Sequence, residues 1–352
     1  MKIQLMVLPF LTALVLSTAI TYLTIIFYKA LGILDKSTSK EHPKHIHERP
    51  VPRGGGVPIF LSILLTALVL LPLDRYLVAI LAGAALILIT GVLDDLFDLS
   101  PYLRLAIGAV AGMIVVGGGV MIGYVSNPFA TGIVDFQSPV LAAGISILWI
   151  MWAMNFVNMG AKGLDGQLPG VTMIAATVMG LLSFRFVNDM TSWPASVISF
   201  ALAGAYGGLL IFNIYPQKIM PGWGGGALAG YFLATLSMLS GAKLATAMIV
   251  LGVPLMDVTY AIIRRVASGK SPVWGDNKHL HHKLLAIGWS KRKIAMFYWL
   301  ITAILGLIAL NLNSQYKVYT IVLTAASVGG LLLWINLFLS SNQPDRDSGS
   351  KT

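Results

Sequence analysis

Eleven apolar windows of 16 to 25 residues run through the sequence, and they constrain the fold more than any other feature. Backbone N–H and C=O groups inside a bilayer must be satisfied within their own segment, so these windows predict membrane-spanning helices. Only 11% of the residues are charged, which fits an integral membrane protein. We expect an all-α polytopic fold of about eleven transmembrane helices, with ten as the alternative. The windows lie near residues 4–28, 56–73, 76–93, 103–124, 139–157, 170–185, 196–213, 225–240, 243–260, 294–312 and 318–340.

The same windows predict a single transmembrane domain over residues 1–340, because no linker between them is long enough for a second one. The first window is too long for the apolar region of a signal peptide, so we interpret it as a retained helix. Residues 341–352 are a polar tail that we expect to be disordered. The chain has no cysteine, which excludes disulfides, iron–sulfur clusters and cysteine-type zinc sites.

The basic residues predict how the chain is oriented. With the N-terminus outside, one set of loops holds 19 of the 24 Lys and Arg residues, and the positive-inside rule places that set in the cytoplasm. The net charge of +10 therefore indicates membrane orientation and anionic ligands, and the spans argue against a nucleic-acid binder. The same face carries the unusual polar segments, which predicts an active site for a cytosolic polar substrate. These segments are 42–56, 94–100, 155–170, 215–226 and 264–293.

Three acids end the third window. If the helix continues, Asp94 and Asp98 share a face and Asp95 is rotated by about 100°. Like charges this close repel, and Mg²⁺ would remove the repulsion while sharing its other positions with phosphate and water. The alternative is a solvated helix end that is stopped by Ser100-Pro101. We favour the metal–phosphate interpretation because basic, glycine-rich loops lie on the same face.

Other polar residues of that face have two interpretations each. Arg53 and Gly55, in PRGGG before the second window, suit phosphate or merely ease entry into the membrane. His42, His45 and His47 precede them and read as a solvated basic loop. Where the fifth window ends, four residues suit sugar or phosphate, or alternatively a helix cap and a turn: Asn155, Asn158, Lys162 and Asp165.

The ninth window and the loop after it hold the last group. Asp257 is an acid within a span, which is a functional hypothesis by default, with pairing to Arg264 as the structural alternative. Residues 264–293 carry eight basic residues and HLHH, which favours binding of phosphate and nucleotide. Zinc held by histidines and Asp276, or a polybasic loop facing lipid, are the alternatives.

Four blocks, taken together, resemble one family. They are HERPVPRGGG (47–56), DDLFDLS (94–100), NFVNMGAKGLDG (155–166) and the long stretch 253–292. The chain resembles the polyprenyl-phosphate N-acetylhexosamine-1-phosphate transferases of glycosyltransferase family 4. The PRGGG and HLHH forms resemble the branch that uses undecaprenyl phosphate and UDP-GlcNAc. The branch that uses UDP-MurNAc-pentapeptide ranks second.

The resemblance implies transfer of N-acetylhexosamine 1-phosphate from a UDP-sugar to undecaprenyl phosphate, with UMP as the other product and Mg²⁺, or Mn²⁺, as cofactor. It implies a multi-pass protein of the bacterial inner membrane that begins cell-envelope glycan synthesis; a homodimer is left open. The implied catalytic residues are Asp94, Asp95, Asp165, His279 and His281. The implied metal ligands are Asp94, Asp95, Asp98 and Asp165. The implied substrate-binding residues are Arg53, Gly55, Asn155, Asn158, Lys162, Asp257, Arg264, Arg265 and His282.

Two stretches depart from the family pattern. An acid is usual before the eighth window, and an ungapped match places Trp223 there. A second acid is usual shortly before Asp165-Gly166, where this chain has Ala161 and Lys162. Lys162 would replace part of the cation charge at the diphosphate. The alternatives from other classes are a transporter and a non-catalytic homologue that binds lipid phosphate.

Overall fold

The computed structural model describes residues 4–35, 50–127, 132–185, 192–239, 244–271 and 279–341, and this part of the chain is all-α. Two short antiparallel strand pairs accompany the helices: β1 (Leu34–Asp35) with β2 (Val51–Pro52), and β3 (Tyr124–Ser126) with β4 (Ile133–Asp135). The helices are α1 (Gln4–Ala30), α2 (Gly56–Leu70), α3 (Arg75–Phe97), α4 (Pro101–Gly117), α5 (Pro139–Gly160), α6 (Gln167–Arg185), α7 (Ser192–Asn213), α8 (Gly222–Met238), α9 (Leu244–Val250), α10 (Gly252–Ala267), α11 (Leu280–Ala286), α12 (Lys291–Asn311) and α13 (Ser314–Ser341).

Every apolar window contains a helix, which confirms the predicted all-α polytopic class. Within the described ranges, seven helices are long and apolar enough to cross a membrane, and α9 with α10 makes up to eight. Both helices of that pair begin in one window, and the pair bends by 77°. Pro254, near the start of α10, lacks an N–H and crowds the preceding turn, which explains the break. Helices α2, α4 and α8 are shorter, at 15, 17 and 17 residues, so the count of eleven spans stays a prediction.

Helix α8 lies at the centre of the bundle, and all its residues are buried. It packs against α2, α3, α5, α6, α7 and α9. Small residues allow the close approach: an ideal Cβ at Gly91 of α3 would lie 2.5 Å from the Cα of Gly224. The Tyr231 hydroxyl donates to the Ile80 carbonyl at 2.8 Å, which satisfies a polar group between α8 and α3. These contacts hold the first turn of α8 beside the last turns of α3.

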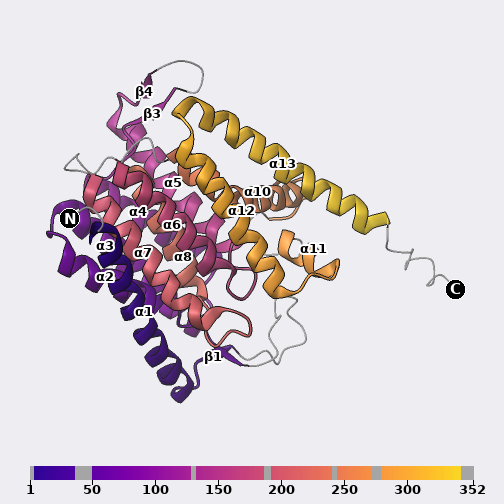
Figure 1. Ribbon diagram of the computed structural model, residues 1–352, viewed down its shortest axis with the longest axis horizontal. Helices are drawn as coiled ribbons and strands as arrows, with labels where there is room; N and C mark the ends of the chain where they lie inside the picture. The colour runs from indigo at the N-terminus through magenta and orange to yellow at the C-terminus, as the bar shows by residue number, and fades with distance from the viewer. Residues whose placement is uncertain are drawn as a thin grey trace.

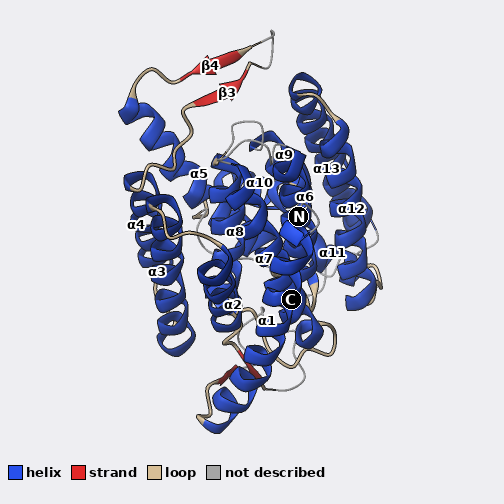
Figure 2. Ribbon diagram, turned by 60° about the vertical axis from the view of Figure 1, so that its left-hand side comes forward, coloured by secondary structure: helices blue, strands red, loops and turns tan. Residues whose placement is uncertain are grey.

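The bundle has two ends of different character (Figures 1 and 2). We call the end where α3 finishes and α8 begins the aspartate end, and the end with β3 and β4 the hairpin end. At the hairpin end, Lys317 donates to the Thr246 hydroxyl at 2.8 Å and Arg185 donates to the Leu310 carbonyl. Each of these two cations therefore bonds a neighbouring helix of the fold. A cavity of about 360 Å³ with mostly apolar lining also lies there, between the ends of α2, α3, α7 and α8.

Candidate active site

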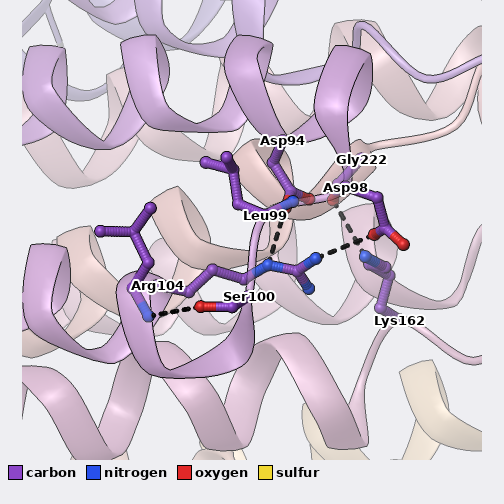
Figure 3. Close-up of polar contacts among 8 residues, drawn as sticks. Asp94, Asp98, Leu99, Ser100, Arg104, Lys162 and Gly222 are labelled. Carbon is purple, nitrogen blue, oxygen red and sulfur yellow. Dashed lines mark hydrogen bonds and ion pairs between the residues drawn. The ribbon is translucent and has the colours of Figure 1, made fainter.

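The joint between α3 and α4 carries Asp94. This residue lies in the last turn of α3 and is 5% exposed. Ser100 caps α4 through the Leu103 N–H, and Pro101 opens the helix, so that Arg104 turns back toward Asp94 (Figure 3). Arg104 Nε lies 2.7 Å from Asp94 Oδ1, and the Leu99 N–H donates to the same oxygen at 3.1 Å. The Asp94 charge is therefore balanced by one cation and one backbone donor.

Asp98 does not continue the helix, so the expectation that Asp94 and Asp98 share a helical face is wrong. Helix α3 ends at Phe97, and Asp98 adopts the left-handed conformation with φ of 49° as its C-cap. Aspartate tolerates this conformation better than most residues. The Asp98 side chain is 88% exposed and accepts from Arg104 Nη2 at 3.1 Å. The two acids share the guanidinium of Arg104, and Asp98 faces solvent.

Asp95 belongs to the last turn of α3, and its side chain lies against the N-terminus of α8. The backbone N–H of Trp223 donates to its carboxylate. An ideal Cβ at Gly222 would lie 2.8 Å from both carboxylate oxygens, so no larger residue fits there. Gly222 also has φ of +66°, which favours glycine. Because a helix N-terminus stabilises negative charge, α8 holds the Asp95 carboxylate at its first turn.

Lys162, like Asp95, lies against Gly222. Its Nζ donates to the Gly222 carbonyl at 3.2 Å (Figure 3). Among the carboxylates, Asp95 acts on the ammonium most strongly and Asp94 also contributes, while Arg53 and Arg104 repel it. Burial lowers the pKa of Lys162 to about 8, and Asp95 opposes that shift. The site thus places an ammonium group, two carboxylates and two guanidinium groups close to the start of α8.

Asp165 is tied to the loop between α7 and α8. It is 4% exposed, and its Oδ2 accepts from the Gln217 N–H at 3.3 Å. The next residue, Gly166, donates its N–H to Asn213 Oδ1 at 2.9 Å, and Asn213 Nδ2 donates to the Ile219 carbonyl at 2.7 Å. These bonds fix the turn after Lys162 to the loop that leads into α8.

A second buried carboxylate, Asp257 of α10, holds the start of α11. Asp257 is fully buried. Its Oδ2 lies 3.0 Å from His279 Nδ1, and its Oδ1 accepts from the Leu280 N–H at 2.8 Å. The alternative that Asp257 pairs with Arg264 is wrong, because α11 brings His279 to it first. The guanidinium of Arg264 lies 5.8 Å from the Tyr260 ring centre, and Arg265 is 4% exposed.

His281 links α11 to the Lys162 loop. Its ring is parallel to that of His279, with centres 5.7 Å apart, and its centre lies 4.2 Å from that of His282. An ideal Cβ at Gly163 would overlap the His281 ring, so the two residues are in contact. Burial lowers the pKa of His281 well below its ordinary value, and His282 and His279 add to the effect, so the ring is neutral at pH 7. At 3% exposure, His281 supports the loop from inside the protein.

Three other expected substrate-binding residues make contacts within the fold. Asn155 Nδ2 donates to the Met151 carbonyl of its own helix at 2.7 Å. The Asn158 amide packs against Gly226 of α8, and its Oδ1 is buried without a hydrogen-bond partner among the residues described. The Gly55 N–H donates to the Arg53 carbonyl at 2.9 Å and to the Met220 carbonyl at 3.0 Å. Phosphate binding by this N–H would require those bonds to open.

Comparison with known proteins decides the family. The family model for glycosyl transferase family 4 matches residues 77–241. The chain is 30% identical over 294 residues to a probable undecaprenyl-phosphate N-acetylglucosaminyl 1-phosphate transferase of Bacillus subtilis, covering 81% of this chain and 78% of the relative. The chain belongs to glycosyl transferase family 4.

This family 4 transferase has further relatives whose names include a polyprenyl phosphate. It is 32% identical over 290 residues to the decaprenyl-phosphate N-acetylglucosaminephosphotransferase of Mycobacterium tuberculosis strain H37Rv, covering 73% of this chain and 71% of the relative. It is 25% identical over 290 residues to the undecaprenyl-phosphate alpha-N-acetylglucosaminyl 1-phosphate transferase of Escherichia coli K12, covering 79% and 76%. The protein is therefore an enzyme of the polyprenyl-phosphate GlcNAc-1-phosphate transferase family and a multi-pass membrane protein.

The magnesium site that the resemblance implies does not fit the side chains of this family 4 transferase. Asp94 and Asp98 are bound to Arg104, Asp95 faces Trp223 and Lys162, and Asp165 is bonded to the loop at Gln217. Within the described ranges, no three His, Asp or Glu side chains gather closely enough to hold a metal ion. The early histidines and Asp276, expected in a basic loop and an alternative zinc site, lie outside those ranges.

Sequence reasoning counted Arg104 only as a basic loop residue and saw Trp223 only as a lost acid. The structure makes Arg104 the partner of Asp94, and it makes the Trp223 backbone a donor to Asp95. The pair Ser100-Pro101, which the sequence analysis considered only as the stop of the preceding helix, is also a helix-start signal, and Arg104 lies one turn after it. That signal was sufficient to suggest that Arg104 faces the acids at the end of the preceding helix.

Proposed function

We propose that this protein transfers GlcNAc 1-phosphate from UDP-GlcNAc to undecaprenyl phosphate, giving a diphospholipid-linked sugar and UMP. The observation that carries the proposal is that Lys162 and Asp95 both lie against Gly222, beside the Asp94–Arg104 pair. Phosphoryl transfer depends on positioning and on positive charge around the phosphate oxygens, and this cluster can supply both. The names of the relatives support the donor and the polyprenyl acceptor.

The proposed transfer reaction requires little proton transfer. An ionised oxygen of the lipid phosphate attacks the β-phosphorus of the UDP-sugar, a new P–O bond forms, and the bond to the α-phosphate oxygen breaks. UMP leaves with that electron pair. We assign Lys162 and Arg53 to the diphosphate, because both lie in the field of Asp95 at the start of α8. Asp95 orients the ammonium, while Arg104 holds Asp94 in place.

The site residues that come from α10 and α11 have a supporting role in this proposal. Asp257 holds His279, and His281 packs on Gly163 next to Lys162. A displacement of α11 would therefore move the loop that carries the ammonium group. Arg264, Arg265 and His282 lie on the same helices and remain predicted contacts for the nucleotide or for phosphate.

We also propose eleven spans with the aspartate end in the cytoplasm of a bacterium, in its inner membrane. Seven long helices, the bent α9–α10 pair and the shorter α2, α4 and α8 together make that number. The loops that the sequence assigns to the cytoplasm carry 19 of the 24 Lys and Arg residues, as the positive-inside rule requires. UDP-sugars are cytosolic and polar, which suits this orientation. Mg²⁺ or Mn²⁺ stays a prediction from the family resemblance, and no step above depends on it.

The test is UMP release by the purified full-length protein in detergent. The reaction contains undecaprenyl phosphate and one member of a panel of UDP-sugars, with Mg²⁺ or with EDTA. We expect release that requires the lipid phosphate and is fastest with UDP-GlcNAc. Reactions without lipid phosphate are the control for simple hydrolysis. No release from any donor, by protein that elutes as a single folded species, would overturn the proposed function.

A further inference from the structure

We infer that the ammonium group of Lys162, in place of a divalent metal ion, is the cation that meets the diphosphate of the sugar nucleotide at Asp95. The inference rests on the proposed function, because it names the cation of that same site. It predicts that the protein binds its sugar nucleotide, and turns it over, in the absence of divalent metal.

The first argument is the charge balance of the two adjacent acids. A divalent ion would be needed to relieve the repulsion between Asp94 and Asp95 if nothing else did so. Here Asp94 has Arg104 Nε at 2.7 Å and the Leu99 N–H at 3.1 Å on one oxygen. Asp95 has the Trp223 N–H and the field of Lys162. Asp94 therefore has a cation and a backbone donor in contact with it. Asp95 has a backbone donor in contact and the ammonium group of Lys162 nearby, at the Gly222 carbonyl, so side chains supply positive charge to both acids.

The second argument is the supply of oxygen ligands. Mg²⁺ demands an octahedral set of oxygens at about 2.1 Å. Asp98 lies beyond the helix end and faces solvent, and Asp165 accepts from the Gln217 N–H. At the start of α8, Trp223 contributes an N–H, which repels a metal ion and attracts an anion. The groups around Asp95 are therefore N–H donors and cations, and of these the ammonium group of Lys162 has N–H donors left for phosphate oxygens.

The third argument is how firmly Lys162 is held. It follows directly after α5, whose C-cap is Ala161. Gly163 packs against His281, and Gly166 is bonded to Asn213. An ammonium has three N–H donors, and one goes to the Gly222 carbonyl at 3.2 Å. The others are available for Asp95 and for a phosphate oxygen, from a position that the loop sets in advance.

The first measurement is binding of UDP-GlcNAc to the full-length protein in detergent by calorimetry, in EDTA and in Mg²⁺. We expect the wild-type Kd in EDTA to lie within about threefold of its value in Mg²⁺. Lys162→Met should weaken binding in EDTA by about tenfold to a hundredfold, the range for a lost charge-assisted hydrogen bond. Lys162→Arg should retain part of the affinity. Lys218→Met is the matched control, because Lys218 is an exposed lysine of the loop before α8 and its removal should leave binding unchanged.

The second measurement is UMP release in EDTA and in Mg²⁺, which separates this inference from the proposed function. Binding and release in EDTA would support both. Binding and release that appear only with Mg²⁺ would overturn the role of Lys162 and leave the transferase reaction intact. Binding in EDTA without release from any donor would support the inference for binding and overturn the proposed function. If Lys162→Met does not fold, the wild-type comparison of EDTA with Mg²⁺ still decides.

Discussion

Two aspartates at the same end of the bundle, the half-buried Asp95 and the buried Asp257, are held in different ways. Both oxygens of Asp257 are engaged, one near His279 Nδ1 at 3.0 Å and one by the Leu280 N–H at 2.8 Å, and the residue is fully buried. Asp95 lies in a narrow crevice lined by glycines of α2, α3 and α8. It lies near Lys162, whose ammonium group has N–H donors besides the one that bonds the Gly222 carbonyl. Asp257 anchors a helix, whereas Asp95 can share its cation with a ligand.

The comparison shows that burial of an acid does not by itself identify a catalytic group. The two centres differ in whether the partner of the carboxylate can also bind another anion. His279 is committed to Asp257 at the start of α11, while Lys162 Nζ donates to one carbonyl, that of Gly222, and has further N–H donors. This distinction would be wrong if an Asp95 variant lost mainly stability, or if an Asp257 variant lost only activity.

Asp95→Asn should reduce turnover by about a hundredfold to a thousandfold while the protein stays folded. Removing the charge releases Lys162 from its orientation, and loss of one preorganised electrostatic group typically lowers the rate by about 10²–10³. UMP release and the thermal unfolding midpoint in detergent are the two measurements. Turnover at the wild-type rate would remove Asp95 from the mechanism.

Asp257→Ala should act mainly on stability, whereas Asp95→Asn should act mainly on turnover. The His279 ring and the Leu280 N–H would both lose their buried acceptor, which should destabilise the protein by about 3 kcal/mol. We expect a lower unfolding midpoint and faster hydrogen exchange in α11, with a smaller loss of turnover than in Asp95→Asn. An inactive variant of unchanged stability would make Asp257 a second centre of the same kind as Asp95.

Gly163→Ala should couple the two centres. Its new Cβ would overlap the His281 ring, and overpacking of this kind costs about 1–3 kcal/mol. Turnover should fall because the Lys162 loop shifts. The double variant Gly163→Ala with His281→Ala removes the overlap and should recover stability relative to the single variant. Equal damage in the single and the double variant would show that the contact between loop and α11 is not the cause.

The pH dependence should show a smaller effect. Burial lowers the pKa of Lys162 to about 8, so the ammonium is complete below that pH and is lost as the pH rises through it. We expect kcat/KM, which reports the free enzyme, to fall about tenfold per pH unit above 8. Lys162→Arg, whose guanidinium stays charged, should shift this decline to higher pH. A decline that is identical in the arginine variant would assign it to another group.

Several local features were predictable from the sequence. The apolar windows became helices, because backbone groups in a bilayer can be satisfied only within their own segment. The Ser100-Pro101 pair started a helix as a cap and a first residue do. The bend at Pro254 and the end of α3 before Asp98 were missed, although both depend on nearby residues. The windows report length and hydrophobicity, and they do not report where one helix turns into the next.

The sequence alone determined that this chain is a polytopic helical membrane protein of a transferase family with acids at one face, since those properties depend on local composition and motif. Only the tertiary structure decided which cation each acid meets. Arg104 reaches Asp94 across a helix joint, His279 reaches Asp257 from another loop, and Lys162 reaches Gly222 from 60 positions away in the chain. Such pairs form because the central α8 brings distant helix ends to one place, and no periodicity in the sequence encodes that meeting.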